Sequence, residues 1–340
     1  MAIMVSVVGA FSAFSTVLKT SYELKSDEQK VNCIKMIAKI PMLAALAYRT
    51  SLGLPPVFPD CKLGFVENFL MMMLKEPGTV WEIHPTILST IDKIFILHAD
   101  HEQCPSTSTV RIAASSNANP FACISAGIAS LWGPLHGAAD EAIIDMLESI
   151  GTRDNINAWI ENAKDKSTNF RLMGFGHRIY KSPDPRSLLM KQMVEDVVRL
   201  IGHVDPLMDI AMELEKKVQE DEYFTSRKIF PNIDFYTGIV YRLIGIPTNM
   251  YTVLFAVSRT SGWMAQWKEM LADDVLKISR PRQLFVGDTK KQIVDIENRQ
   301  KEKKSKVEIA VCGLNLVKNS NSKNEKKEQG TLLRTFSINN

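Results

Sequence analysis

The sequence predicts an all-α protein, and three observations support this prediction. Apolar residues recur at helical spacing along most of the first 288 residues. The alternation of apolar and polar residues that is typical of a strand is rare, and the breaks fall at pairs such as Gly133–Pro134. With 340 residues, 45% hydrophobic and 23% charged, the composition is that of a globular protein with room for one large and one smaller domain.

Residues 1–18 carry no charge, which is the borderline length for a membrane span or the apolar region of a signal peptide. No Lys or Arg precedes the segment, and several Ser, Thr and Gly residues dilute its hydrophobicity. We therefore expect a buried helix here and no membrane partner. No later stretch is expected to reach spanning length.

Helical periodicity predicts the elements that follow. In 31–49 the apolar residues share one face, and Pro41 predicts a kink. Residues 85–100 carry an apolar stripe, and the uncharged run 118–131 predicts a central buried helix. The remaining predicted helices cover 63–75, 137–150, 154–164, 186–201, 206–221, 232–244 and 248–270.

The composition changes after Gly287. Residues 289–340 carry 12 Lys and Arg against 6 Asp and Glu, whereas the rest of the chain has a small negative balance. We expect a mostly disordered basic tail, with a solvated extension favoured over an anion-binding arm. The basic pI therefore belongs to the tail, and the body gives no argument for a nucleic-acid partner.

The cysteine pattern argues against a disulfide framework or a zinc site. Five cysteines occur, an odd number, and no C-x-x-C is present. A reducing compartment fits this usage, and without a visible targeting signal the cytoplasm is the expected location.

Histidines beside glycine, proline or acidic residues are the first candidates for chemistry. The run HADHEQ places His98 and His101 three residues apart on one helix face, so a shared metal ion is conceivable. No third ligand is signalled, which favours a pair at a helix end with satisfied hydrogen bonds. In WGPLHGAADEA, His136 precedes a helix, where a neutral histidine could donate a hydrogen bond to an oxyanion or simply cap the helix.

Two further runs join a possible base to a set of cations. MGFGHRIYKSPDPR exposes His177 in a glycine loop with cations, which suits a carboxylate or phosphate ligand as well as an ordinary surface loop. FPNIDFYTG places Asp234 among apolar neighbours, where it could act as a general base or as a helix cap. Together with the arginines the pattern predicts a helical enzyme that handles a small polyanion. The cations concerned are Arg178, Lys181, Arg186, Arg259, Arg280 and Arg282.

These motifs, in this order, resemble the citrate synthase family over residues 1 to about 288. The runs that carry the resemblance are HADHEQCPSTSTVRIAASSNANPFACISAGIASLWGPLHGAADEA, FRLMGFGHRIYKSPDPR, FPNIDFYTGIVYRLIGIPTNMYTVLFAVSRTSGWMAQWKEM and ISRPRQLFVGD. The sequence resembles the bacterial type of the family more than the animal mitochondrial type. The resemblance implies a large helical domain, residues 1–149 plus 251–288, with a small helical domain, 150–250, closing over a cleft.

The resemblance also implies a reaction: acetyl-CoA condenses with oxaloacetate to citrate and free CoA, without a metal or a further cofactor. Asp234 matches the base, His136 the donor to the enolate, and His177 the group that polarises the oxaloacetate carbonyl. CoA would lie near the GFGHR loop. Substrate carboxylates would be held by His101, Arg186, Arg259 and Arg280, the last supplied by the partner subunit of a homodimer or higher homo-oligomer.

Some features depart from the family pattern. The chain begins inside that pattern, the tail matches nothing in it, and Asp140 stands where the family usually has Asn. We expect the Asp140 charge to weaken the binding of an anion. The alternatives are a 2-methylcitrate synthase, which shares the mechanism, and an inactive truncated relative that acts as a binding subunit.

Overall fold

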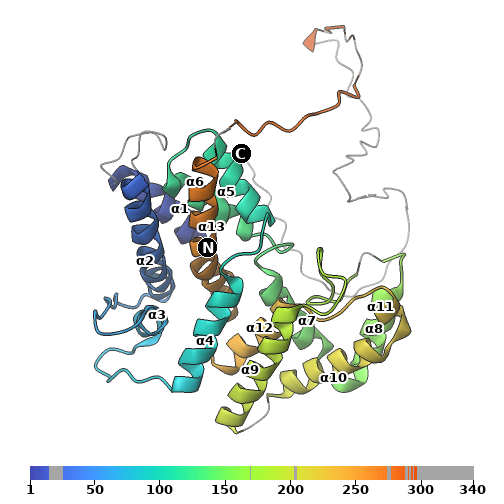
Figure 1. Ribbon diagram of the computed structural model, residues 1–340. Helices are drawn as coiled ribbons and strands as arrows, with labels where there is room; N and C mark the ends of the chain where they lie inside the picture. The colour runs from blue at the N-terminus through green and yellow to red at the C-terminus, as the bar shows by residue number, and fades with distance from the viewer. Residues whose placement is uncertain are drawn as a thin grey trace. The chain divides into compact units, whose positions relative to one another are not determined.

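The computed structural model describes residues 1–14, 26–168, 170–202, 205–273 and 277–287, together with residues 290, 292, 293, 295 and 296. It separates into two units, Met1–Pro281 and Arg282–Asn340. The prediction of an all-α protein is confirmed, because the described residues contain no strand (Figure 1). The helices are α1 (Ala2–Ala10), η1 (Phe11–Phe14), α2 (Ser26–Ser51), α3 (Phe65–Leu74), α4 (Pro85–His98), α5 (Pro105–Ser115), α6 (Pro120–Leu131), α7 (Ala139–Ile150), η2 (Arg153–Asn155), α8 (Ile156–Lys164), α9 (Pro185–Ile201), α10 (Pro206–Glu220), α11 (Glu222–Ser226), α12 (Ile233–Leu243), η3 (Thr248–Met250) and α13 (Tyr251–Leu271).

The uncharged N-terminal segment forms α1 and η1 where it is described. Met4 and Val8 are fully buried, and α1 packs against α6 and α2. The expectation that no later stretch reaches spanning length is wrong: α2, over Asp27–Ser51, is long and apolar enough to cross a membrane by length and composition. Core helices of globular proteins meet the same criterion, and α2 packs against α3 and α13.

Helix α13 is the centre of the main core (Figure 1). It contacts α2, α4, α5 and α6, and the side chains of Trp263 and Trp267 are fully buried. The predicted buried helix at 118–131 is confirmed as α6, which lies between α1, α5 and α13. Burial of large apolar side chains between these helices is the main stabilising contribution.

Five helices that position the functional residues begin in the same way. In α4, α5, α6, α9 and α10, proline occupies the first turn, where its missing N–H costs nothing and its fixed φ suits a helix. In four of the five, the preceding side chain also caps the helix by accepting a backbone hydrogen bond. These signals place the start of each helix within two residues of the predicted start, except for α5.

Gly262 lets α13 approach the end of α4 very closely. Its N–H donates to the Ala99 carbonyl oxygen at 3.1 Å, and a Cβ on Gly262 would clash with that same oxygen. We expect Gly262→Ala to destabilise the fold by about 1–3 kcal/mol, because a backbone atom must move. Thermal unfolding checks this, with Gly64→Ala, where a Cβ meets no atom within 4 Å, as the control. An unchanged melting temperature in Gly262→Ala would contradict the close packing.

The described residues after Pro281 are exposed and lie outside any regular element of more than one residue. The predicted basic tail, 289–340, falls almost entirely outside the described residues. The division of residues 1–288 into a large and a small domain stays a prediction.

Candidate active site

Six of the seven candidate residues lie in one place, five of them at helix ends or in connecting segments. His101 lies in the segment between α4 and α5, His136 between α6 and α7, and His177 between α8 and α9. The remaining three lie on helices, Arg186 in the first turn of α9, Asp234 in the first turn of α12 and Arg259 in the middle of α13.

The expected placement of His98 and His101 on one helix face is wrong. Helix α4 ends at His98, and His101 lies beyond it in the following segment. The two rings therefore serve different surroundings. His98 is buried against α13, whereas His101 turns toward the loop that carries His177.

His101 and His177 face each other across the site, with their Nε2 atoms 3.3 Å apart. Burial and the nearby Arg186, His177 and Arg259 lower the pKa of His101 to about 4. Burial also lowers the pKa of His177, with the Arg186 charge adding to it against an opposing effect of Asp184. Both rings are therefore neutral at pH 7, and one N–H must lie between them.

The His177 tautomer follows from its backbone partners. The N–H groups of Ile179 and Tyr180 donate to His177 Nδ1 at 3.1 and 3.2 Å, so Nδ1 carries the lone pair. The proton of the neutral ring then lies on Nε2, which points into the site. The glycine turn before it is required, since Gly174 and Gly176 have φ of +80° and +83°. A Cβ on Gly174 would also come within 2.9–3.0 Å of Ile143 and Phe235.

A second chain of hydrogen bonds sets the tautomer of His136. The indole N–H of Trp263 donates to Ser106 Oγ at 3.3 Å, and Ser106 Oγ lies 2.8 Å from His136 Nε2. The Ser106 backbone N–H also donates to Nε2, at 3.4 Å. Because Nε2 accepts these bonds, the proton of the neutral ring lies on Nδ1. His136 can therefore donate one hydrogen bond from Nδ1 to a ligand.

Arg259 is almost fully buried and bonds to both ends of the segment between α4 and α5. Its Nε donates to the His98 carbonyl oxygen at 2.6 Å, and its Nη1 donates to Cys104 Sγ at 3.1 Å. Burial alone would raise the pKa of the Cys104 thiol. Hydrogen bonds with His136, Ser106 and Thr107, together with the Arg259 charge, have the larger effect and lower this pKa to about 6. No acceptor within the described residues binds Arg259 Nη2, which leaves it available for an anion.

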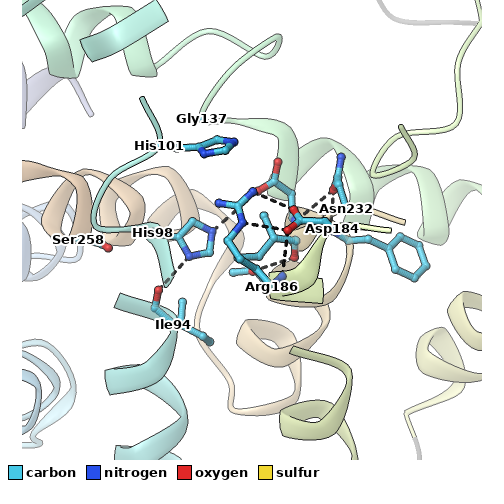
Figure 2. Close-up of polar contacts among 12 residues, drawn as sticks. Ile94, His98, His101, Gly137, Asp184, Arg186, Asn232 and Ser258 are labelled. Atoms are coloured by element: carbon cyan, nitrogen blue, oxygen red, sulfur yellow. Dashed lines mark hydrogen bonds and ion pairs between the residues drawn. The ribbon is translucent and has the colours of Figure 1, made fainter. Parts of the chain in front are cut away.

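Arg186 is held by a carboxylate of its own chain. Asp184 caps α9 and accepts from Arg186 Nε at 3.1 Å and from Nη2 at 2.8 Å, a bidentate pair visible in Figure 2. Burial raises the pKa of Asp184, but the hydrogen bonds and charge of Arg186 outweigh it and keep the pKa below its usual range. Arg186 Nη1 has no acceptor within the described residues, so Asp184 fixes the guanidinium and leaves one edge for a ligand.

Asp234 is partly exposed, with 24% of its side chain accessible, at the start of α12. Asn232 caps this helix by accepting from the backbone N–H groups of Asp234 and Phe235. The alternative of a helix-capping Asp234 is therefore wrong, since Asn232 is the cap. The Asp234 carboxylate accepts no hydrogen bond from the described residues, and His98 Nε2 lies 3.8 Å from its Oδ1.

Arg280 is the candidate that the structure does not bring to this cluster. It is exposed, and the adjacent Ser279 N–H donates to Ser115 Oγ at the C-terminal end of α5. The site lies at the other end of that helix, about 15 Å away along its axis. The role of Arg280 as a residue supplied by a partner subunit stays a prediction.

Asp140, which was expected to carry a negative charge, lies in surroundings that oppose that charge. It is 2% exposed in the first turn of α7, and its Oδ1 is buried without a hydrogen-bond partner among the described residues. Burial, with smaller effects of Asp234 and Glu141, raises the pKa of Asp140 well above its usual range. Burial therefore favours the protonated form of Asp140, which resembles an asparagine in shape and charge.

We expect Asp140→Asn to make stability less dependent on pH. The unfolded chain releases the Asp140 proton near pH 4, whereas the folded protein retains it to a much higher pH. The contribution of Asp140 to the free energy of unfolding is therefore highest below about pH 4. It falls as the pH rises, by up to about 1.4 kcal/mol per pH unit, until the pH reaches the pKa of Asp140 in the folded protein. The variant should gain melting temperature over the wild type at pH 8 and much less at pH 5. An equal gain in melting temperature at both pH values would contradict a raised pKa of Asp140 in the folded protein.

A cavity of about 740 Å³ opens beside His177. Its aromatic lining comes from the segment before α9 and from α11, and Leu135, the neighbour of His136, forms part of it. Arg171, Arg178 and Lys181 give it three cations, so it suits an extended ligand with apolar and anionic parts. No group of three or more metal-ligating side chains occurs among the residues that the structure describes.

Sequence reasoning missed three residues that organise the site. Ser106 and Trp263 set the tautomer of His136, and Cys104 binds Arg259. Ser106 follows Pro105 at the start of α5, a helix that was not predicted. Pro105 at the first helical position is the signal that could have revealed this helix start.

Comparison with known proteins agrees with this arrangement. Residues 1–282 match the family model described as citrate synthase, C-terminal domain. A citrate synthase structure from Pyrobaculum aerophilum is 34% identical with a TM-score of 0.76, covering 87% of this chain and 73% of that one. A ternary complex of the Thermoplasma acidophilum citrate synthase with carboxymethyl coenzyme A and oxaloacetate is 31% identical, with a TM-score of 0.79 and coverage of 88% and 75%. The Thermotoga maritima citrate synthase is 29% identical, with a TM-score of 0.73 and coverage of 88% and 75%.

The matched residues include every element that brings His101, His136, His177, Arg186, Asp234 and Arg259 together. The resemblance noted in the sequence motifs is confirmed by the family model and by the structures. The chain belongs to the citrate synthase family.

Proposed function

We propose that this chain condenses acetyl-CoA with oxaloacetate to citrate and free CoA. The observation that carries the proposal is the meeting of the Asp234 carboxylate, which accepts no hydrogen bond from the described residues, with two histidine donors, His136 and His177. A carbon acid as weak as a thioester methyl group needs a base and an oxyanion donor at the same time. The arginines beside them suit the carboxylates of the second substrate.

In the first step Asp234 takes a proton from the acetyl methyl group. The C–H bond breaks, an O–H bond forms on Asp234, and negative charge moves to the thioester oxygen. The Nδ1–H of His136 donates a hydrogen bond to that oxygen, which stabilises the charge as it develops. Ser106 holds the ring so that Nδ1, and not Nε2, faces the substrate.

In the second step the new carbon nucleophile attacks the oxaloacetate carbonyl carbon. His177 donates its Nε2 proton to the carbonyl oxygen as the alkoxide forms. His101, Arg186 and Arg259 hold the carboxylates, with the Nη groups left by Asp184 and Cys104 as donors. Water then attacks the thioester carbonyl carbon and the C–S bond breaks. A proton from water restores the His177 ring, CoA leaves with the proton held on Asp234, and the new carboxyl group releases its proton to solvent.

The cavity beside His177 is the proposed binding site for the CoA part. Phosphate groups would bind Arg171, Arg178 or Lys181, while the aromatic lining would cover the apolar parts of the ligand. The Thermoplasma acidophilum relative was crystallised with a CoA derivative and oxaloacetate, which supports this class of substrates. We also propose a homodimer, in which Arg280 serves the partner's site.

The test is the release of free thiol when the purified protein meets acetyl-CoA and oxaloacetate. Each substrate alone is the control, and light scattering reports the oligomeric state. Propionyl-CoA in place of acetyl-CoA tests the 2-methylcitrate alternative, because that activity requires the extra methyl group to fit. A folded protein that releases no thiol with either acyl-CoA would overturn the proposal and favour an inactive binding subunit.

A further inference from the structure

His98 is the site histidine that the proposed mechanism leaves without a role. It is the last residue of α4 and only 2% exposed. Its Nδ1 lies 2.9 Å from the Ile94 carbonyl oxygen, as Figure 2 shows. A carbonyl oxygen can only accept, so Nδ1 carries a proton and donates it. With a proton on Nδ1, Nε2 is the nitrogen of the ring that can carry a lone pair.

The Nε2 atom of His98 is buried and has no hydrogen-bond partner among the described residues. The polar group nearest to it is the Asp234 carboxylate, with Oδ1 at 3.8 Å. The ring is held in this orientation by the Ile94 bond and by an edge-on contact with Phe255, whose centroid is 5.0 Å away. A buried acceptor without a donor is costly, unless a donor reaches it during the working cycle.

We infer that His98 is a positioning residue for Asp234, whose Nε2 accepts a hydrogen bond from Asp234 once the carboxylate has taken the methyl proton. The inference rests on the proposed function, in which Asp234 is the base. It assigns the unpartnered nitrogen a donor that exists only after the first chemical step. Before that step both groups are acceptors, so the lone pair on His98 Nε2 and the ionised Asp234 carboxylate do not attract each other. This agrees with the 3.8 Å between Nε2 and Oδ1.

The proton balance is simple. The C–H bond of the substrate breaks and the O–H bond on Asp234 forms, and the proton stays on Asp234 while it bonds to Nε2. No second proton is moved. The distance between His98 Nε2, on α4, and Asp234 Oδ1, on α12, has to shorten by about 1 Å to reach hydrogen-bond length. The new bond stabilises the protonated base and so lowers the barrier to proton abstraction.

The test compares two substitutions of similar shape. In His98→Asn the amide nitrogen takes the place of Nδ1, keeps the Ile94 bond and leaves nothing opposite Asp234. In His98→Gln the longer side chain brings an amide oxygen toward the place of Nε2. We expect His98→Asn to lower kcat by about tenfold to hundredfold, as a part of the roughly 10²–10⁴-fold that acid–base catalysis supplies. The KM values for acetyl-CoA and for oxaloacetate should change little. His98→Gln should recover most of the lost kcat.

The decisive readout is the isotope effect with trideuterated acetyl-CoA. We expect a larger effect in His98→Asn than in the wild type, because proton abstraction becomes slower relative to the other steps. The matched control is His84→Asn at the exposed start of the same helix, where asparagine caps as well as histidine. If His98→Asn fails to fold, His98→Met replaces it, since methionine has the length of glutamine without a strong acceptor.

The outcomes separate the two proposals. An active wild type with unchanged kcat and isotope effect in His98→Asn overturns the role of His98 alone. A lower kcat with an unchanged isotope effect and a lower melting temperature also overturns it, because the ring would then only support the fold. A folded wild type without any activity overturns the proposed function and this inference together.

Discussion

Replacing Asp234 with asparagine is expected to lower kcat by roughly 10²–10⁴-fold, the contribution typical of a general base. The amide has the same shape but cannot take a proton at neutral pH. KM for oxaloacetate should change little, since the anion is proposed to bind His101 and the arginines. Thiol release at saturating substrates measures the effect, and melting temperature reports folding.

Two variants sharpen this experiment. Asp234→Glu keeps the carboxylate but moves it by one methylene group, so it should recover part of the activity. Asp209→Asn changes an exposed aspartate in the first turn of α10, as Asp234 lies in the first turn of α12, and should leave kcat unchanged. The fold should tolerate Asp234→Asn, because Asn232 and not Asp234 caps the helix. Full activity in Asp234→Asn would remove Asp234 from the mechanism.

The fold could be predicted from local signals to a large extent. Helical periodicity and the proline and glycine breaks place α6, α9 and α10 nearly as found, because these signals act within a few residues. Helix α5 escaped prediction for a physical reason. Its buried positions are Ser106, Thr107, Val110 and Ala114, so the face toward the core has no apolar stripe to recognise.

The candidate site was predicted less completely, because its chemistry depends on contacts between distant segments. The residue types of His136, His177 and Asp234 could be chosen from their neighbours in the sequence. The raised pKa of Asp140 could not, since it follows from burial against α12 and from the nearby Asp234. The tautomer of His136 likewise depends on Ser106, which lies 30 residues away in the chain.

Replacing His136 with alanine is expected to lower kcat by roughly 10²–10³-fold, the usual cost of removing one oxyanion donor. The chain of bonds from Trp263 through Ser106 to Nε2 assigns the donor to Nδ1. His136→Asn should therefore retain much more activity than His136→Gln, because the asparagine amide nitrogen takes the place of Nδ1. Thiol release and the melting temperature of each variant check this.

The order of the two amide variants is the informative result, because both are polar and differ only in reach. If His136→Gln is the more active variant, the donor lies at Nε2, and the tautomer inferred from Ser106 is wrong. If both are as inactive as His136→Ala while folded, the imidazole acts as more than a hydrogen-bond donor and has to move a proton. Retained activity in His136→Asn alone places the catalytic contribution of His136 in one hydrogen bond from Nδ1, oriented by a serine and a tryptophan of the central core.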